Sequence, residues 1–139
     1  MNYLLDTCVI SELVKKQPNP KVVNWIDSVA ESSLFLSVIT IGEIQKGVEK
    51  LPPSNRKTSL RRWLNEQLPA RFANRIVSID TELMLVWGRL VARLDQQGNP
   101  MPAIDSLIAA TALHSNFTLV TRNEEDFKHA GVLIFNPWT

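Results

Sequence analysis

The sequence is poor in the residues on which disulfide scaffolds and zinc sites depend. It has one cysteine, Cys8, and two histidines in 139 residues, so it has no internal disulfide and no Cys/His cluster for zinc. A single cysteine fits a reducing cytoplasm, and its simplest role is that of a small buried side chain. No apolar run approaches the roughly 20 residues that a membrane-spanning helix needs.

Targeting and repeat signals are also missing. The amino terminus lacks the basic region and long apolar core of a signal peptide, and we expect a cytoplasmic protein. The chain has no internal repeat, linker or compositionally biased stretch. With 45% apolar and 21% charged residues, its composition is that of a globular protein. Its length corresponds to a single domain, residues 1–139.

The charge is nearly balanced overall but uneven along the chain. The net charge of +1 gives no reason to expect a polyanion partner. From Lys46 to Arg75, however, there are eight basic residues and only two acidic ones, so this stretch carries +6 and the rest carries −5. Such a stretch can contact RNA or an acidic protein partner, and it can equally be a solvated helix face. Charge alone leaves these alternatives open.

Short apolar runs alternate with longer segments of helical periodicity. This alternation indicates an α/β fold in which helices connect the strands of a parallel sheet. The predicted strands are residues 3–5, 34–37, 75–78, 117–120 and 132–135. The predicted helices are residues 8–15, 20–31, 40–51, 55–68, 80–96 and 103–115, with a short turn at 124–129.

Three carboxylates stand in short polar contexts beside these runs. Asp6 follows the first predicted strand, Glu43 lies early in the helix after the second, and Asp105 lies in the first turn of the last long helix. Asn123 follows the fourth strand. The carboxyl ends of parallel strands lie at one edge of the sheet, where ligands bind. Acidic oxygens suit a hard cation such as Mg²⁺ or Mn²⁺, and this points to phosphate chemistry.

Each of these residues also has an explanation that involves no metal. Asp6 can cap the helix that follows it, and Thr40 with Glu43 has the spacing of a capping box. The helix dipole favours an acid such as Asp105 in a first turn, and Asn123 with Asp126 fits the same capping pattern. Pattern alone does not separate a shared metal site from a set of helix caps.

Four segments of the chain carry motifs in a fixed order. They run from Leu4 to Glu12, from Leu36 to Gly47, from Ala103 to Ala112 and from Val120 to Phe127. The ending Phe135-Asn136-Pro137-Trp138 adds a fifth. In this order they resemble the motifs of the PIN-domain ribonucleases, specifically of the VapC-type toxins and in particular of the FitB-like members.

The resemblance implies a single PIN-like domain with a five-stranded parallel sheet flanked by helices. It assigns Asp6, Glu43 and Asp105 to the metal, and it implies hydrolysis of RNA phosphodiester bonds with Mg²⁺ or Mn²⁺. It also implies silencing by a cognate antitoxin and contact with operator DNA only through that antitoxin. Pairing as a homodimer, or as a dimer of toxin–antitoxin heterodimers, is expected, and no membrane partner is.

One position departs from the family pattern. Many members have an aspartate where Asn123 stands, so this side chain would bind metal weakly or through a water, and a second metal is in doubt. The alternative function is therefore a catalytically weak or inactive PIN-like module that binds RNA or protein. Three retained, mutually repelling acids argue against an inactive module.

Polar residues beside the acids are candidates for supporting roles. Thr7, Ser106 and Thr121 are suited to hold the carboxylates or their waters in place, although turns and caps use the same residues. Lys46 lies three residues after Glu43 on one helical face. Lys46 and Arg122 are candidates to contact RNA phosphates.

Overall fold

Five short strands lie side by side in one parallel sheet. The computed structural model describes residues 1–139 and contains the strands β1 (Tyr3–Leu5), β2 (Leu34–Ser37), β3 (Ile76–Val77), β4 (Thr118–Val120) and β5 (Ile134–Phe135). Their order in the sheet is β3-β2-β1-β4-β5, and every neighbouring pair is parallel. The predicted α/β fold with a five-stranded parallel sheet is confirmed.

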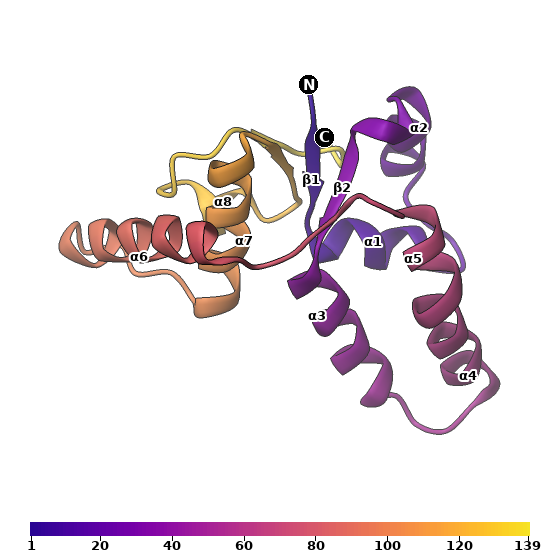
Figure 1. The fold of residues 1–139 in the computed structure, drawn as a ribbon. Coiled ribbons are helices and arrows are strands. Elements are labelled where there is room, and N and C mark those ends of the chain that lie inside the picture. Colours follow the sequence, from indigo (N-terminus) through magenta and orange to yellow (C-terminus); the bar gives the residue numbers. More distant parts are fainter.

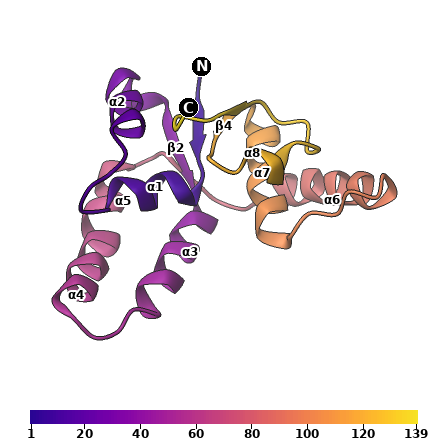
Figure 2. The ribbon, with the colours of Figure 1, turned by 180° about the vertical axis from the view of Figure 1, so that it is seen from behind.

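Helices cover both faces of this sheet, and the central strand β1 belongs to two cores. On one face, Leu5 belongs to a core formed with six helical elements. They are α1 (Thr7–Leu13), α2 (Pro20–Ser28), α3 (Val38–Glu49), α4 (Asn55–Arg62), the π-helical turn η2 (Trp63–Gln67) and α5 (Leu68–Arg71). Leu4 packs on the other face, against α6 (Thr81–Gln96), α7 (Ala103–Ser115) and α8 (Glu124–Phe127). Figures 1 and 2 show the two groups on opposite sides of β1. Successive residues of a strand point to opposite faces, so β1 is held from both sides.

Two of the helices have bounds that differ from prediction. The third helix begins at Val38, two residues early, because the Ser37 hydroxyl accepts a hydrogen bond from the backbone N–H of Ile39 at 3.1 Å. Thr40 therefore lies inside α3, fully buried, and the alternative in which Thr40 and Glu43 form a capping box does not hold. The second helix ends at Ser28, and a separate 3₁₀ turn, η1 (Glu31–Ser33), leads into β2.

The remaining differences lie at the ends of elements. The helical stretch predicted for residues 55–68 continues to Arg71 through η2, a π turn next to Pro69, which has no N–H for the helical ladder. The last three predicted strands are shorter than expected, and the first helix is Thr7–Leu13 where residues 8–15 were predicted. None of the helices combines the length and apolar character that crossing a bilayer requires.

Candidate active site

Asp6 is placed by the pairing of β1 with β4. Leu5 lies opposite Val120, and the backbone N–H of Asp6 continues the ladder to the carbonyl oxygen of Val120 at 2.9 Å. The same register puts Thr121 beside Asp6, and the Thr121 hydroxyl donates to Asp6 Oδ2 at 2.8 Å. Both side chains are buried. Asp6 also caps α1, because its Oδ1 accepts from the backbone N–H of Thr7 at 2.8 Å. The cap and the shared site are therefore compatible.

Glu43 is held on α3 by a residue of α1. The Thr7 hydroxyl donates to Glu43 Oε1 at 2.5 Å, and it lies 3.2 Å from the Thr40 hydroxyl. Thr7 thus links the first turn of α1 to the carboxylate on the neighbouring helix. Two of the predicted supporting residues, Thr7 and Thr121, each hold one carboxylate.

Asp105 reaches the same region from the other side of the sheet. It is the third residue of α7 and is half-buried. Burial, followed by the charges of Asp6, Asp126 and Glu43, raises the pKa of Asp105 to about 6. Burial also raises the pKa of Asp6, and the charge of Glu43 adds to this, while hydrogen bonds from Thr121 and Thr7 oppose it. The carboxylates therefore act on one another although they come from distant segments.

The donor set fits a hard divalent cation by its chemistry. No three Asp, Glu, His or Cys side chains stand at the mutual spacing of a metal-binding cluster. The side chains whose charges converge nevertheless all offer carboxylate oxygen, the ligand that Mg²⁺ and Mn²⁺ prefer. The negative field that raises the pKa of Asp6 and of Asp105 is one that a cation would offset. Asp6, Glu43 and Asp105 are the residues that could hold it.

A fourth carboxylate, Asp126, belongs to this field, and the sequence interpretation did not assign it to the site. The charge of Asp126 raises the pKa of Asp105 more than the charge of Glu43 does. Asn123 stands at the start of α8, its side chain makes no capping hydrogen bond, and its backbone N–H donates to the Thr121 hydroxyl at 3.0 Å. Asp126 lies one turn further on this short helix. The three-residue spacing from Asn123 is the signal in the sequence that points to Asp126, and it is also the spacing of a helix cap.

The contacts of Ser106 fit the turn-and-cap alternative, with an added link to a neighbouring helix. Its hydroxyl donates to the carbonyl oxygen of Ala103 at 2.6 Å and accepts from the indole N–H of Trp87 at 2.9 Å. None of its hydrogen bonds reaches a carboxylate. Ser106 is buried and joins α7 to α6, so it positions the helix that carries Asp105 and does not touch the acid itself.

The two predicted phosphate contacts occupy different settings. Lys46 is exposed on α3 and lines the same hollow as Glu43. The guanidinium of Arg122 lies 5.6 Å from the ring centre of Trp138, a cation–π contact that keeps this cation near the end of β4. Both remain candidates for contact with an anion.

Most of the basic stretch is engaged within the chain. Arg61 pairs with Glu49 at 3.1 Å, and Arg71 pairs with Glu31 at 2.8 Å. These pairs are exposed and add little stability. The ion pairs favour the interpretation that much of the basic stretch is a solvated helix face. Lys46 is an exception, because it lies beside the acids.

Cys8 lies closer to the acids than its expected role as a buried filler suggests. Its sulfur is 3.8 Å from Asp6 Oδ2 and 3.6 Å from the Thr121 hydroxyl, and the side chain is half-buried. Burial and the charge of Asp6 raise the pKa of the thiol. Cys8 is therefore a neutral thiol at neutral pH and supports Asp6 as a weak donor.

Comparison with known proteins identifies the family. A family profile described as the PIN domain matches residues 3–133. The chain belongs to the PIN-domain family. Its relatives include the plasmid stability protein StbB of Pseudomonas syringae, 40% identical, and the toxin FitB of Neisseria gonorrhoeae, 37% identical. The VapC ribonuclease Y4jK of Sinorhizobium fredii is 35% identical. These matches cover 97% of this chain and 96–97% of each relative.

Solved structures share the PIN fold in detail. In the structure of FitAB bound to an IR36 DNA fragment, one chain matches this PIN domain with a TM-score of 0.92 and 36% identity. The match covers 99% of this chain and 96% of that one. The resemblance inferred from the motifs is therefore confirmed along the whole chain.

The raised pKa of Asp105 gives a pH test of the shared field. An acid whose pKa is higher in the folded state than in the unfolded state stabilises the fold at low pH. For Asp105 this contribution is lost as the pH rises from 3.8, the ordinary pKa of the group, to about 6, its pKa in the folded protein. In chelator, the Asp105→Asn variant should match the unsubstituted protein near pH 4. Above pH 6 the variant should be more stable, by on the order of 1 kcal/mol after allowance for solvent screening of this half-exposed group.

Urea unfolding across this pH range measures the difference. The exposed Asp95→Asn on α6, which makes the same substitution away from the carboxylates, serves as the matched control. An Asp105→Asn variant that loses stability relative to the unsubstituted protein as pH rises would contradict the shared field.

Proposed function

We propose that this PIN domain is the toxin of a toxin–antitoxin pair and acts as a ribonuclease that depends on Mg²⁺ or Mn²⁺. The observation that carries the proposal is the convergence of Asp6, Glu43 and Asp105 from three separate elements into one field at the carboxyl edge of the sheet. The names of its relatives, toxin FitB and VapC ribonuclease Y4jK, support the same function. We also propose that the protein acts in the cytoplasm, where its RNA substrate would be found.

Each residue of the site has a distinct task in this proposal. Asp6, Glu43 and Asp105 would hold the cation, and Thr121 and Thr7 fix the orientation of the Asp6 and Glu43 carboxylates. When bound, the cation would activate a water and offset charge on the scissile phosphate.

Lys46 and Arg122 would attract the RNA backbone to a site that is otherwise acidic. Without such cations the carboxylates would repel the phosphates of the substrate. Both side chains are exposed, so a strand of RNA can reach them.

Loss of any one carboxylate should abolish cleavage but not folding. We expect Asp6→Asn, Glu43→Gln and Asp105→Asn each to lower the rate of RNA cleavage by more than about 100-fold, since removing even the partner of a ligand typically costs 10–100-fold. The measurement is cleavage of total RNA with Mn²⁺, with circular dichroism to verify the fold. The matched control is Asp80→Asn, whose carboxylate caps α6 at Leu83 and should affect stability only. Cleavage that persists in excess chelator would refute metal dependence.

We further propose that Asp126 supplies the charge that Asn123 lacks. Asp126 acts on Asp105 directly, whereas Asn123 could only bind a metal weakly or through a water. Asp126→Asn should raise the Mn²⁺ concentration for half-maximal cleavage by about tenfold, and Asn123→Ala should raise it less. Glu125→Gln is the control on the same helix, because Glu125 is exposed and pairs with Lys128. Equal effects of Asp126→Asn and Glu125→Gln would place Asp126 outside the site.

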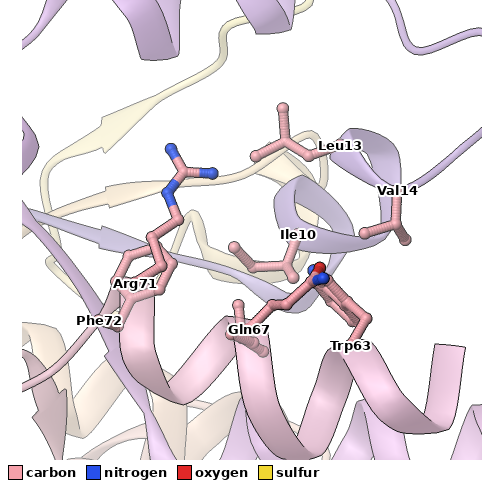
Figure 3. Close-up of a pocket in the computed structure, with 8 residues that line it drawn as sticks. Ile10, Leu13, Val14, Trp63, Gln67, Arg71 and Phe72 are labelled. Carbon is pink, nitrogen blue, oxygen red and sulfur yellow. The ribbon is translucent and has the colours of Figure 1, made fainter. Parts of the chain in front are cut away.

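An apolar hollow away from the acids is the proposed seat of the antitoxin. It has a volume of about 310 Å³ and lies between α1 and the long helix formed by α4, η2 and α5. Figure 3 shows Ile10 and Leu13 on one side and Trp63 and Phe72 on the other. A second hollow of about 510 Å³ shares Leu13 and Trp63 with it, so the two form one groove. An apolar groove of this kind accepts an amphipathic helix.

Helix α1 connects this groove to the carboxylates. Thr7 at its start bonds to Glu43, and Leu13 at its end lines the groove, a separation of roughly 10 Å along the helix axis. An antitoxin segment lying along α1 could therefore place an Arg or Lys among the carboxylates. Arg suits this position better because its planar fork engages a carboxylate bidentately.

The antitoxin would also account for any contact with DNA. The related FitAB structure is bound to a DNA fragment. We propose that this chain reaches operator DNA only through its antitoxin, as a homodimer or as a dimer of toxin–antitoxin heterodimers.

A charge in the groove should separate antitoxin binding from catalysis. We expect Leu13→Asp to prevent co-purification with the protein encoded by the adjacent gene, because an unpaired carboxylate would be buried at the interface. RNA cleavage by the isolated variant should remain within about twofold of the unsubstituted protein, since Leu13 does not touch the acids. The control is Leu133→Asp, at an exposed position before β5. A Leu13→Asp protein that still binds and is still inhibited would mean that the antitoxin sits elsewhere.

A further inference from the structure

A separate notch adjoins the carboxylates, between α3 and α7. It has a volume of about 360 Å³ and is lined by Ile39, Gly42, Glu43, Lys46 and Ile104. The two helices contact each other, and Figures 1 and 2 show them on either side of the carboxyl end of β1. Glu43 belongs both to the acidic site and to the wall of this notch. The notch is therefore continuous with the place where the scissile phosphate would lie.

The walls of the notch are apolar, which metal binding does not require. Ile39 lines it from α3, and Ile104, with 43% of its surface exposed, lines it from α7. Gly42 adds no side chain, and a Cβ atom there would meet nothing within 4 Å. A ligand with a flat apolar face could thus pack between the two isoleucines while its polar edge faces the acids or solvent.

Lys46 gives the notch an available positive charge. It lies one turn beyond Glu43 on the same face of α3. The ion pairs of the structure use Lys15, Arg61, Arg71, Arg75 and Lys128, and neither they nor the hydrogen bonds occupy the Lys46 ammonium. The phosphate next to the one at the acidic site would therefore contact this ammonium.

We propose that this notch binds the nucleoside next to the scissile phosphate, with its base between Ile39 and Ile104 and the following phosphate on Lys46. This inference rests on the proposed ribonuclease function and names the part of the RNA that the site holds. A volume of about 360 Å³ is at the small end of the roughly 300–1,000 Å³ range of small-molecule sites, which suits one nucleoside better than a protein helix. The two isoleucines have no group that reads a base edge, so this subsite adds affinity without strict sequence selection.

The test measures RNA binding separately from cleavage. In an Asp6→Asn background, which should not cut, fluorescence anisotropy gives the Kd for a short labelled single-stranded RNA. Ile104→Ala and Lys46→Ala should each weaken binding by about fivefold, and Lys46→Arg should restore it. In the active protein the same changes should raise KM with kcat within about twofold, because they act equally on the ground and transition states. Leu133→Ala and Lys16→Ala, both at exposed positions outside the notch, should change neither quantity.

Three results would overturn the subsite. The first is an unchanged Kd for both Ile104→Ala and Lys46→Ala, and the second is a failure of the Asp6→Asn protein to bind RNA. The third is conversion of a dimer to a monomer by Ile104→Ala in sedimentation velocity, because a second copy of the chain would then cover the notch. A protein that binds RNA through the notch but does not cut it with Mn²⁺ would refute the ribonuclease proposal, and the notch would then be an RNA-binding site without a scissile phosphate.

Discussion

The repulsion between carboxylates at one edge of the sheet is the constraint on which the rest of the structure depends. Asp6 is buried, and Asp105 is half-buried close enough to feel the charges of Asp6, Glu43 and Asp126. Burial and like charge both oppose ionisation. Packing and hydrogen bonds in the rest of the fold must therefore hold these carboxylates close together against their mutual repulsion. Such an arrangement has a cost in stability that a purely structural set of helix caps would not incur.

The sheet offsets this cost because several independent contacts fix the central strand. Leu4 and Leu5 anchor β1 in two cores, and the backbone ladder continues through Asp6 to Val120. Two threonine hydroxyls then fix the acids, Thr121 on Asp6 and Thr7 on Glu43. None of these contacts comes from a mobile terminus or a long loop. The site can be rigid before any ligand binds, which is the condition for efficient positioning of a reacting phosphate.

The strands and the positions of Asp6 and Glu43 at the carboxyl edge could be predicted from sequence because each depends on local signals. A buried parallel strand appears as a short apolar run, and an acid just beyond it lies at the carboxyl edge by topology. The place of Asp105 was not accessible in this way, since it depends on how α7 packs against α3 after the long excursion through α6. Its assignment came from resemblance to a family.

The failures of prediction share a physical cause. Ser37, three residues before Thr40, accepts the capping hydrogen bond of α3, and Thr40 is buried inside the helix. The Ser106 hydroxyl is used by the indole of Trp87, a residue 19 positions earlier that no local pattern relates to it. Asp126 lies one turn of α8 beyond Asn123, and its effect on Asp105 depends on how α8 packs against α7. Hydroxyl partners and short-range field strengths are set by three-dimensional packing, which periodicity does not encode.

Three proposed functions occupy three places on this molecule: the carboxylates for a cation, the notch beside them for a nucleoside and the groove at the far end of α1 for the antitoxin. The central proposal is that the carboxylates form one cation site, and anomalous scattering from crystals grown with Mn²⁺ tests this most directly. We expect a manganese peak in contact with carboxylate oxygens of Asp6 and Asp105, on the side of Glu43. A peak held only by the exposed acids Glu124 and Glu125, or no peak near Asp6 at saturating Mn²⁺, would contradict it.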